Sequence, residues 1–247
     1  MSTTRPGRSP PSGTSGSASQ SSSRCPTSPQ FIEGEHSFYP GVRAMDPRRE
    51  VAREAARLLY TGAAEEYMHA KERAARSLGI NAKPSNHEVA VELDHLSDQM
   101  EGEDRRRLLV RMRGHALDLM RFLAEYDPVL TGSVWRGTAR RGSDLDINVY
   151  SHRPDEVESE LRSAGYSVED SRGEVAVHGG RTIRSTHIYI TLNGIQGEVV
   201  VRPPEERDEA ERCEIYGDAK RGLTLTDLEK LMKTDPLRKF VPGRRYK

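Results

Sequence analysis

Two aspartates one residue apart stand in the short run DLDINVY at residues 144–150. At the alternating period of a β-strand, Asp144, Asp146 and Asn148 share one face and the apolar residues share the other. The two carboxylates then lie about 7 Å apart at Cα. Neighbouring anions raise each other's pKa unless a cation lies between them, and Mg²⁺ takes oxygen ligands of this kind. An Asp-x-Asp pair alone is more typical of an exposed strand or turn than of a metal site. The residues that precede it therefore decide between these two interpretations.

A Gly-Ser pair and several arginines come directly before the aspartates. Ser133 suits the N-cap of a helical turn through Trp135. Glycine lets the backbone approach a ligand closely, and free N–H groups at such a turn hold phosphate oxygens. Arginine adds forked donors that fit phosphate. The predicted phosphate-binding residues are Gly132, Ser133, Arg136, Thr138 and Arg140, with Arg141 adding further positive charge.

The run GSVWRGTARRGSDLDINV at residues 132–149 resembles the signature of the nucleotidyltransferase superfamily, which includes DNA polymerase beta. The signature consists of Gly-Ser, a spacer of about ten residues and an Asp-x-Asp flanked by apolar residues. The chain is most similar to the small archaeal-type predicted nucleotidyltransferases, and more distantly to archaeal CCA-adding enzymes and minimal nucleotidyltransferase antitoxins. The resemblance implies an α+β fold in which helices flank a mixed sheet.

The resemblance also implies a third carboxylate on a later strand. Glu198 in GEVVV is the best match, and Glu174 in GEVAV has the same local pattern and is its rival. Family members often carry Asp at this place, and the alternative for Glu198 is an exposed edge-strand residue. By this resemblance Asp144, Asp146 and Glu198 are the catalytic residues and the ligands of two Mg²⁺ ions.

The activity implied is transfer of a nucleoside monophosphate from an NTP, with ATP as one candidate, to an acceptor hydroxyl, with release of pyrophosphate. RNA, protein and small molecules all remain open as acceptors, although the chain is short for a tRNA-gripping CCA-adding enzyme. The alternative function is an antitoxin-like or regulatory module that binds a nucleotide and a partner protein but has little transferase activity.

The residues before this site carry a helical pattern. Asp46 followed by Pro47 predicts a helix start, and a second helix is expected to end at Gly79. Ser85 and Glu88 form a capping box that opens a third helix, and a fourth is expected to start near Glu103. We therefore expect a helical region over residues 45–126.

After residue 126 the period changes to that of strands. Short runs rich in Val, Ile and Tyr are separated by turn residues, and Asn193-Gly194 between the last two predicts a hairpin. Helices are expected over residues 154–163 and 224–233. The expected strands are PVLTGS, DLDINVY, EVAVHGG, THIYITL and GEVVVRP. Strands interspersed with helices indicate an α+β nucleotidyltransferase core over residues 127–205, followed by a C-terminal helical extension at 206–247.

The first 44 residues are rich in Ser, Pro and Gly and contain little that folding could bury. We predict a disordered tail, or a gene start extended upstream of Met45. An organelle transit peptide is the alternative, because the segment has arginines and no acid before Glu33.

The overall composition excludes several classes of protein. Basic and acidic residues both number 38, so nucleic acid cannot be held by net charge alone. Two cysteines do not make a disulfide framework, and no apolar run reaches the ~18 residues of a membrane span. We expect a soluble, cytoplasmic protein with no membrane partner. Five arginines, at 105, 106, 107, 111 and 113, predict a solvated helix face, with an RNA- or partner-binding strip as the alternative.

Overall fold

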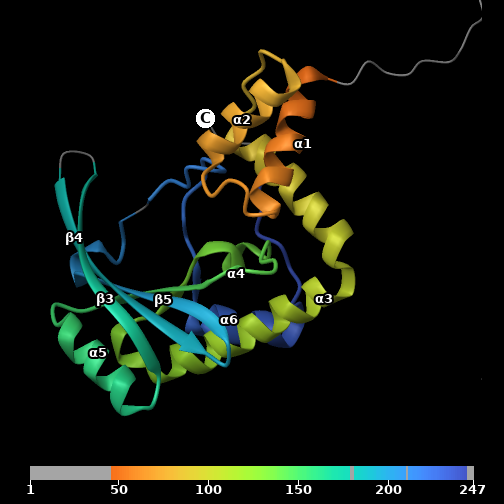
Figure 1. Cartoon of the computed structure of the whole chain (residues 1–247). Coiled ribbons are helices and arrows are strands. Elements are labelled where there is room, and N and C mark those ends of the chain that lie inside the picture. Colours follow the sequence, from red (N-terminus) through yellow and green to blue (C-terminus); the bar gives the residue numbers. More distant parts are fainter. Residues whose placement is uncertain (1–45, 179–180, 210, 244–247) are drawn as a thin grey trace, which may run out of the picture. The chain divides into compact units, whose positions relative to one another are not determined.

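The computed structural model describes residues 46–178, 181–209 and 211–243. Every element below lies within these described ranges (Figure 1). The predicted tail at residues 1–44 and the alternative start at Met45 lie outside the described residues.

The N-terminal helices begin and end at the predicted caps. The side chain of Asp46 accepts a hydrogen bond from the Arg48 N–H, and Pro47 occupies the first helical position. Gly79 adopts the left-handed conformation at the end of the second helix. Ser85 and Glu88 form a reciprocal capping box. The three helices are α1 (Pro47–Tyr60), α2 (Tyr67–Leu78) and α3 (Asn86–Phe122).

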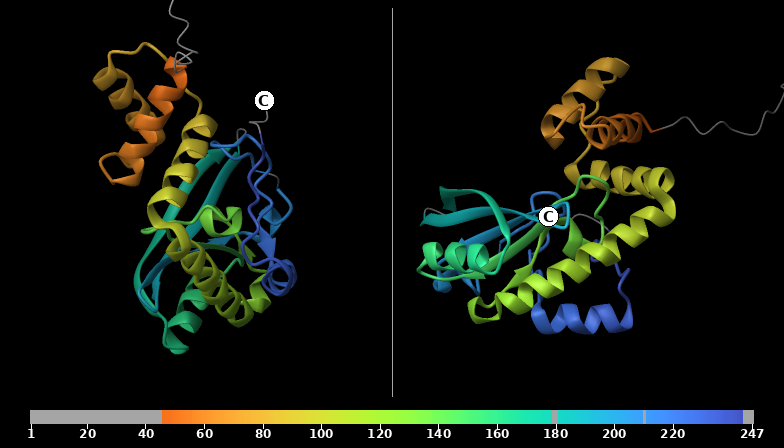
Figure 2. Two further views of the ribbon diagram at one scale, coloured as in Figure 1. Left: turned by 90° about the vertical axis from the view of Figure 1, so that its right-hand side faces the viewer. Right: turned by 60° about the horizontal axis from the view of Figure 1, so that its bottom comes forward.

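Helix α3 bends at Gly102, whose φ of 52° and ψ of −125° are not helical. The two predicted helices are therefore the two halves of α3, and Figure 2 shows the bend between them. The first half packs against α1 and α2 in a small apolar cluster that includes Val51, Leu59 and Val89. The second half, from Leu109, belongs to the larger core built around the sheet.

A six-stranded mixed sheet forms the centre of the molecule, with strand order β3-β4-β5-β2-β1-β6. Strands β2 and β5 pair in parallel, and the other neighbours pair antiparallel. This arrangement confirms the predicted α+β class. The strands are β1 (Val129–Leu130), β2 (Leu145–Tyr150), β3 (Ser167–His178), β4 (Arg181–Leu192), β5 (Ile195–Arg202) and β6 (Leu223–Thr224). The helices are α4 (Gly132–Arg136), α5 (Pro154–Ser163) and α6 (Leu225–Thr234), with 3-10 turns at Ala124–Tyr126 and Pro204–Glu206.

The connections between strands agree with the turn residues. Asn193 and Gly194 both have positive φ, at 48° and 79°, and join β4 to β5 in a two-residue hairpin. Strands β3 and β4 are longer than predicted, since their pairing runs from Ser167 opposite Thr191. The short strand β6, which pairs with β1 from within the C-terminal extension, was not predicted.

The core lies between one face of the sheet and three helices. The second half of α3, α5 and α6 lie on this side (Figure 1) and contribute Met112, Leu161 and Leu228, all 1% exposed or less. No helix among the described residues has the length and apolar character needed to cross a membrane.

The sequence predicted that Arg113 lies on a solvated helix face, but in the structure this residue is fully buried. Its guanidinium donates to the carbonyls of Val134 and Trp135 in α4, and to those of Pro236 and Arg238 after α6. Burial lowers its pKa to about 10, so it is still charged at neutral pH. Arg113 thus fixes α4 and the C-terminal segment to α3.

Arg105 is also buried, again against the prediction. It donates to the carboxylates of Asp94 and Asp98 in the first half of α3 and to the carbonyls of Thr138 and Ala139 after α4. Both half-helices of α3 are therefore tied to the segment that contains the Gly-Ser pair.

Replacing Arg113 with leucine should lower the free energy of unfolding by roughly 3 kcal/mol, because four carbonyls lose their donor and two of these hydrogen bonds are buried. Arg106→Ala on the exposed side of the same helix is the control and should change it by less than about 0.5 kcal/mol. Urea unfolding of both variants measures the difference. Equal stability of the two variants would contradict the assigned role of Arg113.

Candidate active site

Strand β2 presents Asp146 on the face of the sheet opposite the core. Burial alternates along the strand, so Leu145 and Ile147 are buried while Asp146 and Asn148 are partly exposed. The predicted separation of polar and apolar residues on this strand is confirmed. Asp144 lies just before the strand and is exposed.

Glu198 in β5 is the register partner of Asp146 in β2. Because the two strands are parallel neighbours, their Cα atoms are about 4.8 Å apart and the two side chains leave the sheet on the same face. Glu174, the rival third acid, lies in β3 opposite Ser185, and two strands, β4 and β5, separate it from β2. The structure therefore brings Glu198, and not Glu174, beside the aspartates.

The three carboxylates influence each other's ionisation. Burial first, and then the charges of Glu198 and Asp144, raise the pKa of Asp146 to about 6. The pKa of Asp144 is also raised, by burial first and by Glu198 second. Without a cation the cluster thus holds more negative charge than its surroundings offset.

His187, in the run THIYITL, also belongs to this site. Its Nδ1 lies 2.7 Å from Oε1 of Glu198. Its Nε2 lies 2.9 Å from Oγ of Ser185 and 3.5 Å from Oε2 of Glu174. The ring therefore links the two candidate acids and holds Glu198 in place. The alternation of THIYITL was the signal, since it places residue 187 on the face that carries Glu198.

The donor set suits a hard divalent cation. Asp144, Asp146 and Glu198 supply only carboxylate oxygens, which Mg²⁺ prefers, and the raised pKa of Asp146 shows that positive charge would stabilise the cluster. Within the described ranges, no three His, Cys, Asp or Glu side chains already stand in metal-binding geometry. Because Glu198 is bonded to His187, its carboxylate has to turn from that ring to join an ion held by the aspartates.

Gly132 lies directly against Asp146. A Cβ atom at this position would stand 1.7 Å from Oδ2 of Asp146, and the φ of Gly132 is +66°. Glycine is therefore required both by the conformation and by the close approach. The N-cap of α4 is Thr131, so the expectation that Ser133 caps this turn is wrong. The N–H of Thr131 donates to the carbonyl of Asp146, which joins α4 to β2.

The other predicted phosphate ligands all line a cavity beside Gly132: Ser133, Arg136, Thr138 and Arg140. Arg136 is 5% exposed, and its two terminal nitrogens donate to the carboxylate of Asp218 and to the carbonyl of Phe240. These partners already use the donors of its guanidinium, so Arg136 is not a phosphate ligand.

A family model for the nucleotidyltransferase domain matches residues 116–215. The match runs from the last turns of α3 to beyond β5 and includes Gly132, Ser133, Asp144, Asp146 and Glu198. Helices α1 and α2 and most of α3 lie outside it.

Similar solved structures include a mutant of Cid1 poly(U) polymerase bound to MgATP, with 20% identity and a TM-score of 0.26. That match covers 38% of this chain and 32% of the polymerase. A cytoplasmic RNA terminal U-transferase matches with 21% identity and a TM-score of 0.25, covering 47% of this chain and 34% of its own. The chain thus spans about a third of the length of these proteins. No curated protein sequence matches the chain.

The raised pKa of Asp146 predicts a pH-dependent loss of stability in the cation-free protein. The protonated carboxyl of Asp146 contributes to the free energy of unfolding below about pH 4. This contribution is lost as the pH rises through about 6, because the buried carboxylate must then ionise. Asp146→Asn should therefore be about 3 kcal/mol more stable than the wild type at pH 7.5 and not at pH 4. Unfolding with EDTA across this range measures the difference, and a pH-independent difference would refute the assignment.

Gly132→Ala should disturb Asp146, whereas Gly142→Ala should not. Both glycines have positive φ, but nothing lies within 4 Å of a Cβ at Gly142. The two variants share a backbone cost of about 1 kcal/mol, so the difference between them isolates the contact with Asp146. We expect Gly132→Ala alone to lose the rise in melting temperature that Mg²⁺ or Mn²⁺ gives the wild type. The same loss in both variants would show that the contact is unimportant.

Proposed function

We propose that this chain is a metal-dependent enzyme that transfers a nucleoside monophosphate from an NTP to an acceptor hydroxyl, because residues 116–215 match a family model for the nucleotidyltransferase domain. The proposal is supported most directly by one observation. Asp146 and Glu198 face each other in register on neighbouring parallel strands, with Asp144 close enough to add to the pKa shift of Asp146.

The reaction proposed is an in-line displacement at the α-phosphorus of the NTP. The acceptor oxygen forms a bond to this phosphorus and releases its proton to water. The bond from the α-phosphorus to the oxygen that bridges to the β-phosphate breaks, and pyrophosphate leaves with the electron pair. The negative charge on the transferring and leaving groups must be offset, and the carboxylates can do so only by holding cations.

Two Mg²⁺ ions are the cofactors that this donor set favours. Asp144 and Asp146 would hold both ions, and Glu198 would complete the shell of the ion on the acceptor side. When bound, the ions lower the pKa of the acceptor hydroxyl and neutralise the charge that develops on the leaving pyrophosphate. In the free protein, His187 keeps Glu198 oriented by their 2.7 Å contact.

Gly132 and Ser133 are the proposed triphosphate-binding residues. Gly132 has no side chain, so phosphate oxygens can approach the backbone next to Asp146. Ser133 offers its hydroxyl, and Arg140 offers the cation that Arg136 does not, since both line the adjoining cavity. Thr138 completes the set from the same loop, and its carbonyl is fixed by Arg105.

A groove of about 550 Å³ borders Asp144 and is the proposed path of the acceptor. Its lining includes four arginines and two further acids, and Arg107 is paired with Asp104. The four arginines are Arg107, Arg111, Arg140 and Arg141, and the two acids are Glu101 and Asp104. Clustered arginines that end at a catalytic carboxylate suit a polyanion, so we propose RNA as the acceptor. We propose the cytoplasm as the place of action.

Asp144→Asn and Asp146→Asn should each reduce transfer at least roughly a hundredfold, because charge in the transition state is then no longer offset. Glu198→Gln should do the same, while Glu174→Gln, the matched change at the rival acid, should stay near the wild-type rate. Incubating each protein with labelled NTPs, Mg²⁺ and separate RNA and protein extracts measures both the rate and the acceptor.

The antitoxin-like alternative makes the opposite prediction in the same experiment. It would give nucleotide binding without transfer in the wild type, together with a stable partner protein. Unchanged turnover in Asp146→Asn would exclude the proposed catalytic centre.

A further inference from the structure

Tyr189 in β4 stands beside the acid that the proposed function places on the acceptor side. It is the register partner of Glu198 in β5, and Glu198 is in turn the register partner of Asp146 in β2. Residues directly opposite each other in paired strands leave the sheet on the same face. Ile188 and Ile190 are fully buried in the core, while Tyr189 is partly exposed. The phenol therefore lies on the open face of the sheet that carries the carboxylates.

The hydroxyl of Tyr189 lies close to the carboxylate of Glu198. Burial is the first cause that raises the pKa of Tyr189, and the next two are the charge of Glu198 and a side-chain hydrogen bond with it. Both of these effects require a short distance between the hydroxyl and the carboxylate. The phenol oxygen is thus a neighbour of the acid that would hold the acceptor-side ion.

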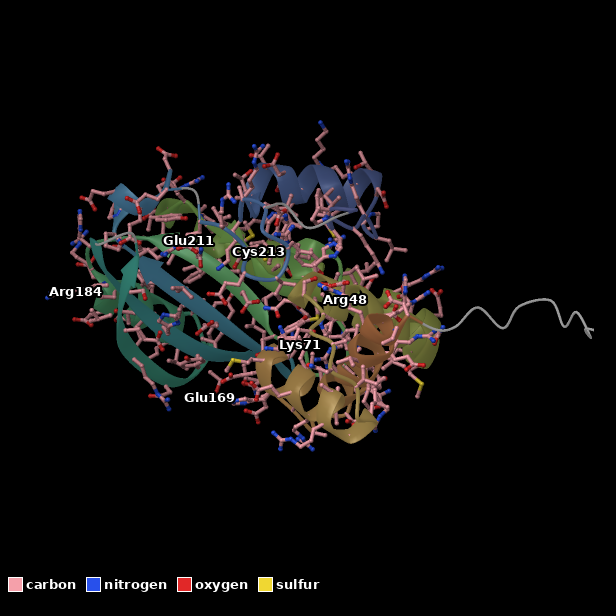
Figure 3. All side chains as sticks on the ribbon, turned by 90° about the horizontal axis from the view of Figure 1, so that it is seen from above. Arg48, Lys71, Glu169, Arg184, Glu211 and Cys213 are labelled. Atoms are coloured by element: carbon pink, nitrogen blue, oxygen red, sulfur yellow. The ribbon has the colours of Figure 1, made fainter. Side chains whose placement is uncertain are left out.

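The ring of Tyr189 is bordered on its other side by β3. The guanidinium of Arg172 lies 5.9 Å from the ring centroid and is paired with Asp170 at 2.5 Å. A cation over an aromatic ring favours that position of the ring. Figure 3 labels Glu169, which directly precedes Asp170, the register partner of Tyr189 in β3. The neighbouring strands on both sides therefore hold the phenol over the sheet beside Glu198.

Other hydroxyls near the site are less well placed to act as acceptors. The hydroxyl of Thr131 donates to a backbone carbonyl, and that of Ser143 accepts a backbone N–H within its own loop. Ser185 lies four residues away from Tyr189 along β4. Tyr189 is the hydroxyl-bearing residue that the sheet places directly opposite the third acid.

We propose, on the basis of the function proposed above, that Tyr189 is an acceptor within the chain itself and that the protein nucleotidylates its own phenol. The phenolic oxygen forms a bond to the α-phosphorus of the NTP and releases its proton to water. The bond from the α-phosphorus to the oxygen that bridges to the β-phosphate breaks, and pyrophosphate leaves with the electron pair. The product is a phosphodiester between Tyr189 and the nucleoside. An acceptor built into the site loses no translational freedom on reacting, so this step needs no RNA.

Incubation of the full chain with Mg²⁺ and NTPs labelled at the α-phosphate, without any other acceptor, tests the inference. We expect the label to remain on the denatured chain and the intact mass to increase by one nucleotidyl group. Peptide mapping by mass spectrometry should place this group on Tyr189. A nucleotidyl group on another residue, such as Ser143 next to Asp144, would overturn the inference.

Single substitutions supply the matched comparison. Tyr189→Phe removes only the hydroxyl and should lose the label. Tyr150→Phe is the control and should be labelled like the wild type, since Tyr150 lies on the same face of β2 but four residues beyond Asp146. Asp146→Asn should also lose the label, because self-modification uses the same carboxylates as transfer. Label that persists in Tyr189→Phe or in Asp146→Asn would overturn the inference.

Dilution of the wild-type protein tests whether donor site and acceptor belong to one molecule. The labelled fraction per unit time should stay the same over the dilution series, because the reaction is intramolecular. A rate that rises in proportion to protein concentration would assign the acceptor to a second copy and overturn the inference.

A parallel reaction that contains the RNA extract separates this inference from the proposed function. Transfer to RNA without label on the chain would overturn the inference alone. Absence of label from the chain and from every extract would instead contradict the proposed function, on which the inference rests.

Discussion

Three buried arginines fix the segment that carries the Gly-Ser pair, and the arrangement of the site depends on them. Arg113 bonds the backbone of α4, Arg105 bonds the loop that follows, and Arg136 lies within α4 itself. Each guanidinium is removed from water, which is costly unless its donors are used. Their partners are backbone carbonyls and carboxylates from the first half of α3 and from the C-terminal segment. The helical region, the sheet and the C-terminal segment are therefore joined at the loop beside Asp146.

This arrangement supports the proposal that a short loop holds a highly charged substrate. The carboxylates come from β2 and β5, two central strands whose register is fixed by the apolar face beneath them. Gly132 lies directly against Asp146, so the backbone proposed to bind phosphate and the carboxylate proposed to bind a cation are adjacent without an intervening side chain. Gly132 and Asp146, placed in this way before the substrate arrives, need little reorganisation when charge develops during transfer, whereas Glu198 must first leave His187.

Local patterns predicted the elements, but not the long-range contacts that assemble the site. The alternation in DLDINVY, the capping box at Ser85 and the Asn193-Gly194 turn each depend on neighbours in sequence, and the structure confirms all three. Arg113 bonds residues 123 and 125 positions away, and Arg136 bonds Asp218, 82 positions away. No local periodicity distinguishes such an arginine from one on a solvated face. The link from His187 to Glu198 was missed for the same reason, because it crosses between strands.

A crystal structure of the protein with Mn²⁺ and a nonhydrolysable NTP, with anomalous scattering to locate the metal, tests the central claim most directly. The account predicts manganese between Asp144 and Asp146, with Glu198 turned from His187 towards it and the triphosphate over Gly132 and Ser133. Manganese at other residues, or a nucleotide bound away from Gly132, would contradict the account.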